Sequence, residues 1–325
     1  MGKKSPKKGS RAFWHRKRAP KLVSRVRSWP SGANAGKGLL GFAAFKAGMT
    51  HVLMIDDTES PTKGQEVTHA ATILEVPPLF VYAIVAYEST PYGLKAFAQI
   101  TATNAPKAFS EVLPLAKKTG KTIEEVEKSI SRASEVRVLA FTQPEKTGFA
   151  SKKSKPLEIG VGGANAAEKF AVAREFLGKE VGFSQVFSEG DFVDVIAVTK
   201  GKGWQGVVKR FGIALNPRKA TKSRRHGGSI GGERQAKVFY TVPRAGQTGF
   251  HRRTDFNKRI LKISKDASEV SLTGAVSHYG KLRCEFILLE GSVPGSSKRI
   301  IRLRKPLFKR VSRKPELKEI VKHQS

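Results

Sequence analysis

The residues with the clearest chemical meaning lie between Lys200 and Arg259, where cations alternate with glycines. From Lys209 to Arg259 the chain has fourteen Lys and Arg residues against two acids, Glu233 and Asp255. A segment this basic cannot bury its own cations, because an unpaired buried charge costs too much free energy. It needs a polyanion to pack against. A nucleic-acid backbone is such a polyanion, and glycines let the protein main chain approach it closely.

Two apolar runs flank the basic stretch, Phe192–Val198 before it and 238–242 near its far end. Both are rich in β-branched and aromatic residues, which predicts strands. Composition alone fits a disordered basic loop equally well. The flanking strands favour instead a glycine-rich extension that grows out of a sheet and becomes ordered on its partner.

Patterns that could support catalysis or cofactor binding are weak. The run Gly160-Val161-Gly162-Gly163 lies between a possible strand and a possible helix, as in a dinucleotide fingerprint, but Asn165 stands at the third glycine position. The histidines show no metal-ligand spacing, and there is no G-x-S-x-G elbow. We predict a protein that is not an enzyme, with no catalytic residue, metal or cofactor. A nucleotide-dependent enzyme acting on RNA stays open as a third hypothesis, on the glycine run alone.

The chain of 325 residues carries 60 Lys and Arg against 27 Asp and Glu, a formal net charge of +33. This charge indicates nucleic acid or an anionic membrane as the partner. The longest apolar run, 79–87, is too short to span a membrane, and the basic N-terminus lacks the apolar core of a secretory signal. The single cysteine, Cys284, excludes an intrachain disulfide and is typical of a core thiol. We therefore predict a cytoplasmic, nucleic-acid-binding protein of about two domains with no membrane partner.

The first 55 residues contain thirteen Lys and Arg and no acid. The start of this segment is a basic arm that cannot fold by itself. Trp14 and Trp29 lie among its arginines, and aromatic rings among cations suit stacking on RNA bases. Docking of each ring on the protein's own body is an equally good explanation.

Short strands joined by turn signals predict a mainly β fold with a small closed barrel. The segment 41–56 is predicted as two strands around a turn at Lys46-Ala47-Gly48, and Ile300–Arg304 as an edge strand with a cationic outer side. The other predicted strands are 68–76, 81–87, 94–103, 136–142 and 282–289, and the predicted helices are 105–118, 122–133 and 166–177.

Composition divides the chain into regions. Residues 101–180 carry fourteen Lys and Arg against ten Glu, and this near balance indicates an inserted α/β domain. The predicted regions are a basic N-terminal arm (1–38), a discontinuous β-barrel core (39–104 and 180–300), the α/β insertion (105–179), a basic extension (209–259) and a basic C-terminal tail (301–325).

Five separated segments, in the right order, resemble the universal large-subunit ribosomal protein three family. They are 199–212, 244–254, 48–54, His278-Tyr279-Gly280, and Gly291-Ser292-Val293-Pro294-Gly295 continuing to Lys298-Arg299. The resemblance covers nearly the whole chain. The long basic arm and the large insertion are similar to the archaeal–eukaryotic branch, and the compact form favours an archaeal-type member.

The resemblance implies a barrel of the translation-protein type that binds 23S-type rRNA near its 3′ end and acts early in assembly of the large (50S) subunit. It also implies that the extension runs toward the peptidyl-transferase centre, and that neighbouring large-subunit proteins are partners. In many relatives the extension tip carries a tryptophan. Here the tip reads Ile230-Gly231-Gly232-Glu233-Arg234-Gln235-Ala236, so a role that needs an aromatic wedge is in doubt.

We predict a structural rRNA-binding protein of the ribosome, with no homo-oligomer; the alternative is a free-standing RNA- or DNA-binding protein outside the ribosome. The predicted rRNA-binding residues are Lys7, Arg11, Trp14, Arg16, Lys17, Arg18, Arg25, Trp29, Lys200, Lys202, Trp204, Lys209, Arg210, Arg218, Lys219, Lys222, Arg224, Arg225, His226, Arg234, Lys237, Arg244, Gln247, His251, Arg252, Arg253, Lys298 and Arg299.

Overall fold

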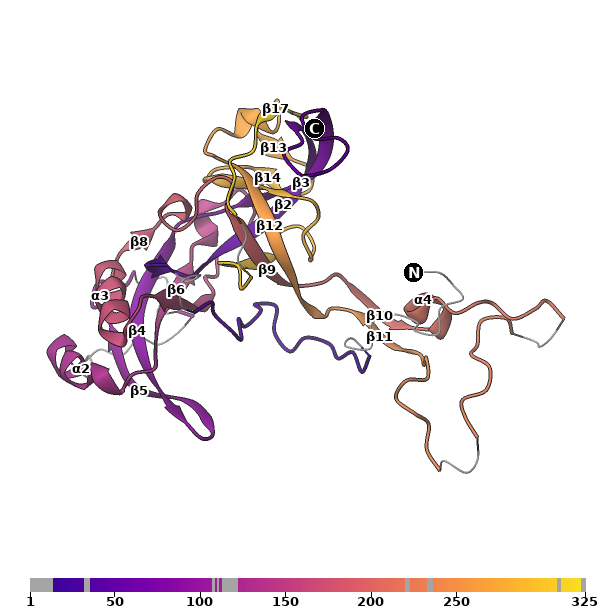
Figure 1. Cartoon of the computed structure of the whole chain (residues 1–325), viewed down its shortest axis with the longest axis horizontal. Coiled ribbons are helices and arrows are strands. Elements are labelled where there is room, and N and C mark those ends of the chain that lie inside the picture. Colours follow the sequence, from indigo (N-terminus) through magenta and orange to yellow (C-terminus); the bar gives the residue numbers. More distant parts are fainter. Residues whose placement is uncertain are drawn as a thin grey trace. The chain divides into compact units, whose positions relative to one another are not determined.

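The structure is a computed structural model that describes residues 14–31, 36–106, 109, 111–112, 122–219, 223–232, 236–308 and 311–322. The chain divides into two compact units, each made of two segments. Unit 1 comprises Met1–Leu22 and Val198–Arg253, and unit 2 comprises Val23–Ala197 and Thr254–Ser325. Strands dominate the described residues and helices are few, so the prediction of a mainly β protein is confirmed (Figure 1). No helix in the described ranges is long and apolar enough to cross a membrane.

Unit 2 is built around a seven-stranded sheet with the strand order β16-β9-β12-β15-β3-β2-β17. Because β16 also pairs with β2, the first six of these strands form a hydrogen-bonded ring. Apolar side chains of these strands, among them Phe42, Ile73, Leu261 and Leu288, are buried in a hydrophobic core. The strands are β2 (Gly41–Ile55), β3 (Glu66–Glu75), β9 (Phe192–Val198), β12 (Arg252–Ser264), β15 (Phe286–Glu290), β16 (Ile300–Arg304) and β17 (Leu317–Ile320).

Strand β2 is one continuous strand of fifteen residues, so the prediction of two strands around a turn is wrong. Its pairing with β3 shifts register between Lys46 and Gly48, which is the mark of a β-bulge. The bulge directs the nearly buried Lys46 ammonium toward the turn after β15. There it donates to the Val293 carbonyl at 2.6 Å and to the Gly295 carbonyl at 3.4 Å. The residues Lys46-Ala47-Gly48, which suggest a turn in the sequence, therefore form a bulge in β2. Through this bulge Lys46 holds the turn that follows β15.

Strand β16 pairs on both sides, with β9 and with β2, so the prediction of an edge strand is wrong. Its two arginines are buried rather than outward-facing. Arg304 forms a 2.6 Å ion pair with Asp194, and its other nitrogen donates to the Ser28 carbonyl at 2.7 Å. Arg302 donates to the Glu158 carbonyl, and burial lowers the pKa of Arg302 to about 10. Apolar and basic residues alternate along β16 because both faces of this strand are buried. One face carries the apolar side chains and the other carries Arg302 and Arg304.

The second sheet of unit 2 has the strand order β1-β7-β6-β4-β5, with β8 paired to β4. These strands are β1 (Gly38–Leu39), β4 (Leu79–Thr90), β5 (Gly93–Thr101), β6 (Glu135–Thr142), β7 (Pro156–Gly162) and β8 (Glu180–Val181). Strands β4 and β5 come from the predicted barrel segment, yet β4 pairs with β6 of the predicted insertion, so both strands belong to this second sheet. The two sheets share one hydrophobic core cluster.

Two helices belong to this second part of unit 2, as Figure 1 shows. Helix α3 (Ala166–Phe176) packs on β6 and β7 through Phe170 and Ala173. Helix α2 (Ile123–Ser129) begins at Thr122, which forms the predicted capping box with Glu125. The helix predicted over 105–118 lies mostly outside the described residues.

The remaining elements of unit 2 are short. Strands β13 (Ala275–Val276) and β14 (Gly280–Lys281) form a small antiparallel pair. The 3-10 turns are η3 (Ile130–Arg132), η4 (Pro144–Lys146), η5 (Phe183–Gln185) and η7 (Ala267–Glu269).

Unit 1 contains β10 (Gly201–Gln205), β11 (Gly246–Gly249) and the short helix α4 (Val207–Phe211). The strand predicted at 238–242 is absent; these described residues form turns and irregular backbone. Val238, Phe239 and Tyr240 are 43–56% exposed, so no sheet buries the apolar run that suggested a strand.

The buried pair of Arg304 and Asp194 should be essential for the stability of unit 2. Removing one partner leaves an uncompensated buried charge, and Asp194 also accepts from the Leu307 and Asn257 amides. We expect Asp194→Ala to lower the free energy of unfolding by about 3–5 kcal/mol. The matched control is Glu59→Ala, at an exposed carboxylate, which should change it by less than about 0.5 kcal/mol. Urea denaturation measures both, and equal effects would show that the pair does not stabilise the fold.

Candidate nucleic-acid interface

Charge is distributed very unevenly between the two units. Unit 1 contains 23 of the 60 Lys and Arg residues but one of the 27 acids, Glu233. In unit 2, the buried Arg137 pairs with Glu135 and Glu158, and the buried Arg259 pairs with Asp57. The described part of unit 1 contains no Asp or Glu to balance its cations. Their counter-charge must come from outside the unit.

A two-stranded hairpin forms the base of the extension. Strands β10 and β11 pair antiparallel, with Trp204 opposite Gln247 and Gly201 opposite Gly249. Gly249 has φ +72°, and a Cβ there would lie 2.1 Å from the Lys200 carbonyl oxygen. Only glycine fits this position. Helix α4 follows β10 directly and ends at Gly212, which adopts the left-handed conformation of a helix C-cap.

Arg210 on α4 ties the two sides of this hairpin together. Its Nε donates to the Gln247 carbonyl at 3.2 Å, and its Nη1 donates to the Arg244 carbonyl at 2.9 Å. In unit 1, backbone carbonyls thus accept the hydrogen bonds of a guanidinium that carboxylates accept in unit 2. They fix the guanidinium by hydrogen bonds while leaving its charge unneutralised.

The N-terminal arm docks on the base of the extension. Trp14 is buried, and its ring lies 5.2 Å from that of Phe211. The Ala19 amide donates to the Phe250 carbonyl at 2.7 Å. For Trp14 the structure therefore favours docking on the protein's own body. No local pattern predicts this contact, because Trp14 and Phe211 are almost two hundred residues apart in the chain.

His251 holds the arm to the extension. It is 5% exposed, and its Nδ1 lies 2.8 Å from the Lys17 carbonyl oxygen. A carbonyl can only accept, so Nδ1 carries the proton. Burial, followed by the charges of Arg253 and Arg16, lowers the pKa of His251, against the opposing effect of the hydrogen bond. The imidazole is therefore neutral at neutral pH and acts as an internal tie.

Trp29 belongs to unit 2 and packs there. A Cβ built on Gly160 would lie 2.7 Å from the Trp29 ring, and one built on Gly41 would lie 2.8 Å from it. These glycines make room for the indole. Gly160 is therefore explained by packing, without a bound nucleotide.

A hollow of about 710 Å³ adjoins the rest of the glycine run, but a carboxylate of the protein lies at the start of the following helix. The Ala164 amide, which follows it, donates to Glu168 at 2.7 Å, and Glu168 pairs with Lys37 at 2.6 Å. The protein's own carboxylate thus occupies the start of α3, where a nucleotide phosphate would bind. This arrangement weighs against the nucleotide-dependent hypothesis.

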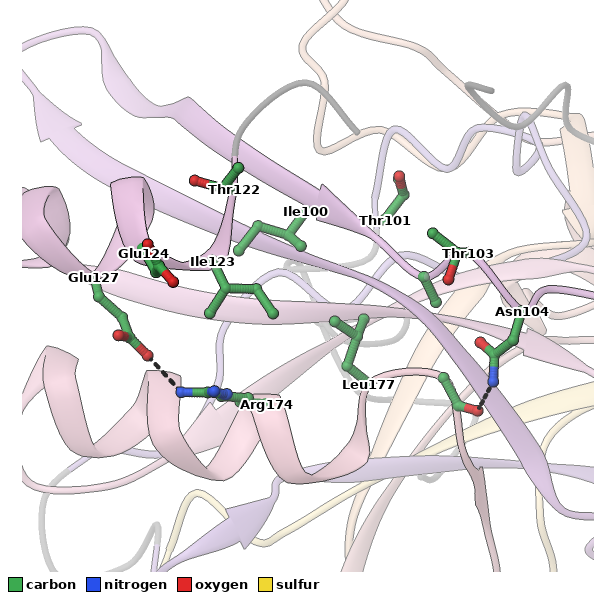
Figure 2. Close-up of a pocket in the computed structure, with 12 residues that line it drawn as sticks. Ile100, Thr101, Thr103, Asn104, Thr122, Ile123, Glu124, Glu127, Arg174 and Leu177 are labelled. Carbon is green, nitrogen blue, oxygen red and sulfur yellow. Dashed lines mark hydrogen bonds and ion pairs between the residues drawn. The ribbon is translucent and has the colours of Figure 1, made fainter. Parts of the chain in front are cut away.

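A hollow of about 690 Å³ lies between α2, the end of β5 and the end of α3 (Figure 2). The ion pair of Arg174 and Glu127, 2.8 Å long, lies in it, and Asn104 donates to the Gly178 carbonyl. Its lining contains no Ser, Cys or His that could act as a nucleophile or base. Across the described ranges, no group of three or more His, Cys, Asp or Glu could hold a metal ion.

Comparison with known proteins decides the family. The family model of Ribosomal protein L3 matches residues 1–324, nearly the entire chain. The chain belongs to this family. Among its relatives, the Large ribosomal subunit protein uL3 of Pyrobaculum arsenaticum is 46% identical over 310 residues, covering 93% of this chain and 91% of that protein. The protein of the same name from Methanothermobacter thermautotrophicus is 46% identical over 311 residues, with the same coverage. That from Methanopyrus kandleri is 43% identical over 306 residues, covering 92% of this chain and 84% of that protein. These archaeal relatives confirm the resemblance to an archaeal-type member.

The predicted rRNA-binding residues fall into groups in this member of the family. Thirteen of the 28 are exposed in unit 1. Exposed in unit 1 are Lys17, Arg18, Lys200, Lys202, Trp204, Lys209, Arg218, Lys219, Arg224, Arg225, His226, Lys237 and Arg244. Half-buried there are Arg16, Arg210, Gln247, Arg252 and Arg253, and buried are Trp14 and His251. In unit 2 are Arg25, Trp29, Lys298 and Arg299. Lys7, Arg11, Lys222 and Arg234 lie outside the described residues.

The neutral state of His251 makes the arm contact sensitive to pH. The unfolded chain keeps a histidine pKa of about 6.5, whereas that of the folded unit is lower. As the pH falls through about 6.5, the unfolded chain binds a proton that the folded unit does not, so folding of unit 1 becomes less favourable. Hydrogen exchange of residues 14–19, corrected for intrinsic rates, should accelerate between about pH 7.5 and about pH 5.5.

The matched variant for this prediction is His251→Asn. Its amide keeps a donor toward the Lys17 carbonyl but cannot titrate in this range. The variant should therefore lose most of the pH dependence. An identical pH response in variant and wild type would mean that His251 is not the titrating group.

Proposed function

We propose that this protein is a structural, non-catalytic constituent of the large ribosomal subunit that binds large-subunit rRNA through unit 1. The observation that supports this most directly is the concentration of 23 cations beside a single acid in unit 1. A surface of this kind binds RNA by neutralising phosphates and releasing counterions. The name of the relatives, Large ribosomal subunit protein uL3, supports the ribosome as its setting, within the cytoplasm.

The finer points of the proposal come from the family resemblance. The protein binds 23S-type rRNA near its 3′ end, acts early in assembly of the large subunit and sends its extension toward the peptidyl-transferase centre. Residues 213–232, as far as described, form no strand or helix, and the side chains of Leu215 and Ile230 are exposed. An extended basic segment of this kind suits passage between RNA helices rather than packing on protein. Without a tryptophan, its tip acts through backbone and cations.

The regions of unit 2 take complementary roles in this proposal. The six-stranded ring is the closed barrel of the translation-protein type, and the α/β insertion (105–179) supplies β6, β7, α2 and α3 of the second sheet. Neighbouring large-subunit proteins are the partners of its less basic surface. That surface includes the tip of the β4–β5 hairpin, where Tyr92 is fully exposed.

Sedimentation distinguishes this proposal from the alternative, a free-standing RNA- or DNA-binding protein. A ribosomal constituent should remain with large subunits through a high-salt wash, because many phosphate contacts release together slowly. Recovery of the protein only in fractions free of ribosomes would contradict the proposal.

Phosphate neutralisation predicts where charge matters. Reversing Arg224 and Arg225 to Glu, at exposed positions in unit 1, should weaken binding to a large-subunit rRNA fragment by more than about tenfold and flatten its salt dependence. Reversing Lys152 and Lys153 to Glu, at exposed positions in unit 2, changes the net charge equally and should have much less effect. Filter binding across a KCl series measures both. Equal losses at the two pairs would assign binding to overall charge rather than to unit 1.

A further inference from the structure

Two hollows in unit 2 adjoin along the helices α2 and α3. The hollow at the end of β5, of about 690 Å³, is followed by a second hollow of about 630 Å³ between α2, η3 and α3. Glu127 and Arg174 line both, and their ion pair of 2.8 Å lies where the two hollows meet. We call the two hollows together the α2–α3 groove.

The floor of this groove is apolar. Figure 2 shows Ile100, Ile123 and Leu177 around the first hollow, and Ile130 and the buried Phe170 line the second. Phe170 and Leu177 are seven residues apart on α3 and its C-cap, which corresponds to about 10 Å along a helix. The groove therefore has room for two apolar side chains about 10 Å apart, the spacing of residues i and i+7 on a partner helix.

The outer side of α3 lets a partner approach closely. Ala167 and Ala171, one helical turn apart, are exposed and line the second hollow. The distance between a helix and its neighbour depends on the side chains at their contact, and methyl groups allow the shortest distances. A partner segment can therefore lie along α3 and reach both hollows.

The rim of the groove is acidic, in a chain that is otherwise strongly basic. Glu124, Glu127 and Glu175 line the groove, and Arg174 is the single cation among the described lining residues. No described Lys or Arg pairs with Glu124 or Glu175. Carboxylates repel the phosphates of RNA and attract the Lys and Arg side chains of a protein. The charge of the groove therefore selects a basic protein segment over RNA.

The ion pair between the hollows does not close the groove to a cation. The side chains of Arg174 and Glu127 are 57% and 44% exposed. An exposed ion pair contributes little to stability, so a partner cation can replace Arg174 at Glu127 at small cost. Three carboxylates can thus receive the cations of a bound segment.

We propose that the α2–α3 groove binds a basic amphipathic segment of a neighbouring large-subunit protein. Apolar side chains of that segment fill the two hollows, and its Lys or Arg side chains pair with Glu124, Glu127 and Glu175. This inference rests on the proposed function, in which the protein is a constituent of the large subunit. It adds a protein-binding site on unit 2 whose charge is opposite to that of unit 1.

A photocross-linking residue at position 128 tests this site in the large subunit. Lys128 is exposed on α2, one turn after Glu124, and lines neither hollow. The full-length protein with p-benzoylphenylalanine in place of Lys128 would be assembled into large subunits and irradiated. Mass spectrometry should identify a cross-linked protein segment in which apolar residues alternate with Lys or Arg. A cross-link to rRNA, to an acidic protein segment or to no other molecule would overturn the inference.

The contribution of charge is tested by matched carboxylate substitutions in the labelled protein. Glu124→Gln combined with Glu175→Gln removes both unpaired carboxylates of the groove and should lower the cross-link yield about fivefold. Glu59→Gln combined with Glu319→Gln removes two exposed carboxylates elsewhere in unit 2 and should leave the yield unchanged. Equal yields from the two double variants would contradict recognition by the groove carboxylates.

The contribution of the hollows is tested without a change of charge. Ala171→Gln places a larger side chain in the second hollow and should lower the yield about fivefold, because it excludes the apolar side chain of the partner. The matched control is Ala96→Gln, at an exposed position of β5 outside both hollows, which should have no effect. A yield that Ala171→Gln leaves unchanged would show that the partner does not enter the groove.

Two further measurements separate failure of this inference from other failures. Each substituted position in the groove is exposed, so the free variants should melt within about 2 °C of the wild type, and a lower yield would then reflect lost binding. If the labelled protein enters large subunits but cross-links to no protein, the groove assignment is wrong and the proposed function stands. If the wild type does not enter large subunits, the proposed function itself fails.

Discussion

The near absence of carboxylates from unit 1 is the constraint on which the rest of the structure depends. With 23 cations and one acid, this unit cannot neutralise its own charge by ion pairs. Its interior is built from other interactions: the aromatic contact of Trp14 with Phe211, carbonyl bonds to Arg210, and a neutral His251. These interactions fold the unit without removing its charge. The full positive charge therefore remains available to an external polyanion.

Unit 2 differs from unit 1 because most of its buried charges are paired within the protein. Among the described residues, three of its four buried arginines pair with carboxylates, as in the pair of Arg304 and Asp194 and the two-hydrogen-bond contact of Arg259 with Asp57. Glu75, fully buried, accepts from the Tyr279 hydroxyl and from the amides of Arg283 and Cys284, so it joins β3 to the segment before β15. Buried polar groups of this kind are tolerated because each has its partner. One unit thus uses its charges to fold, and the other keeps them for binding.

Sequence patterns predicted the parts of this molecule that depend on local composition. The strands β3, β4, β6 and β9, the helix α3 and the capping box at Thr122 follow from periodicity and end signals. Parts that depend on distant partners were missed. Ile300–Arg304 looked like an edge strand because nothing local shows that Asp194 would receive Arg304. The apolar run 238–242 looked like a strand, although no neighbouring strand is available to pair with it. The sequence leaves RNA stacking and docking on the protein open for Trp14 and predicts RNA contact for His251; the fold buries both side chains within unit 1.

We propose that unit 1, rather than the β4–β5 hairpin of unit 2, faces the rRNA. Site-directed hydroxyl-radical cleavage tests it most directly, since Cys284 is the single cysteine of the chain and can be replaced by Ser. An iron probe would be attached in that background to Lys202→Cys in unit 1 or to Lys95→Cys on β5, both exposed positions, and the proteins assembled into large subunits. If unit 1 faces the rRNA, we expect strong rRNA cleavage from position 202 and little from position 95. Cleavage from position 95 as strong as that from position 202 would contradict it.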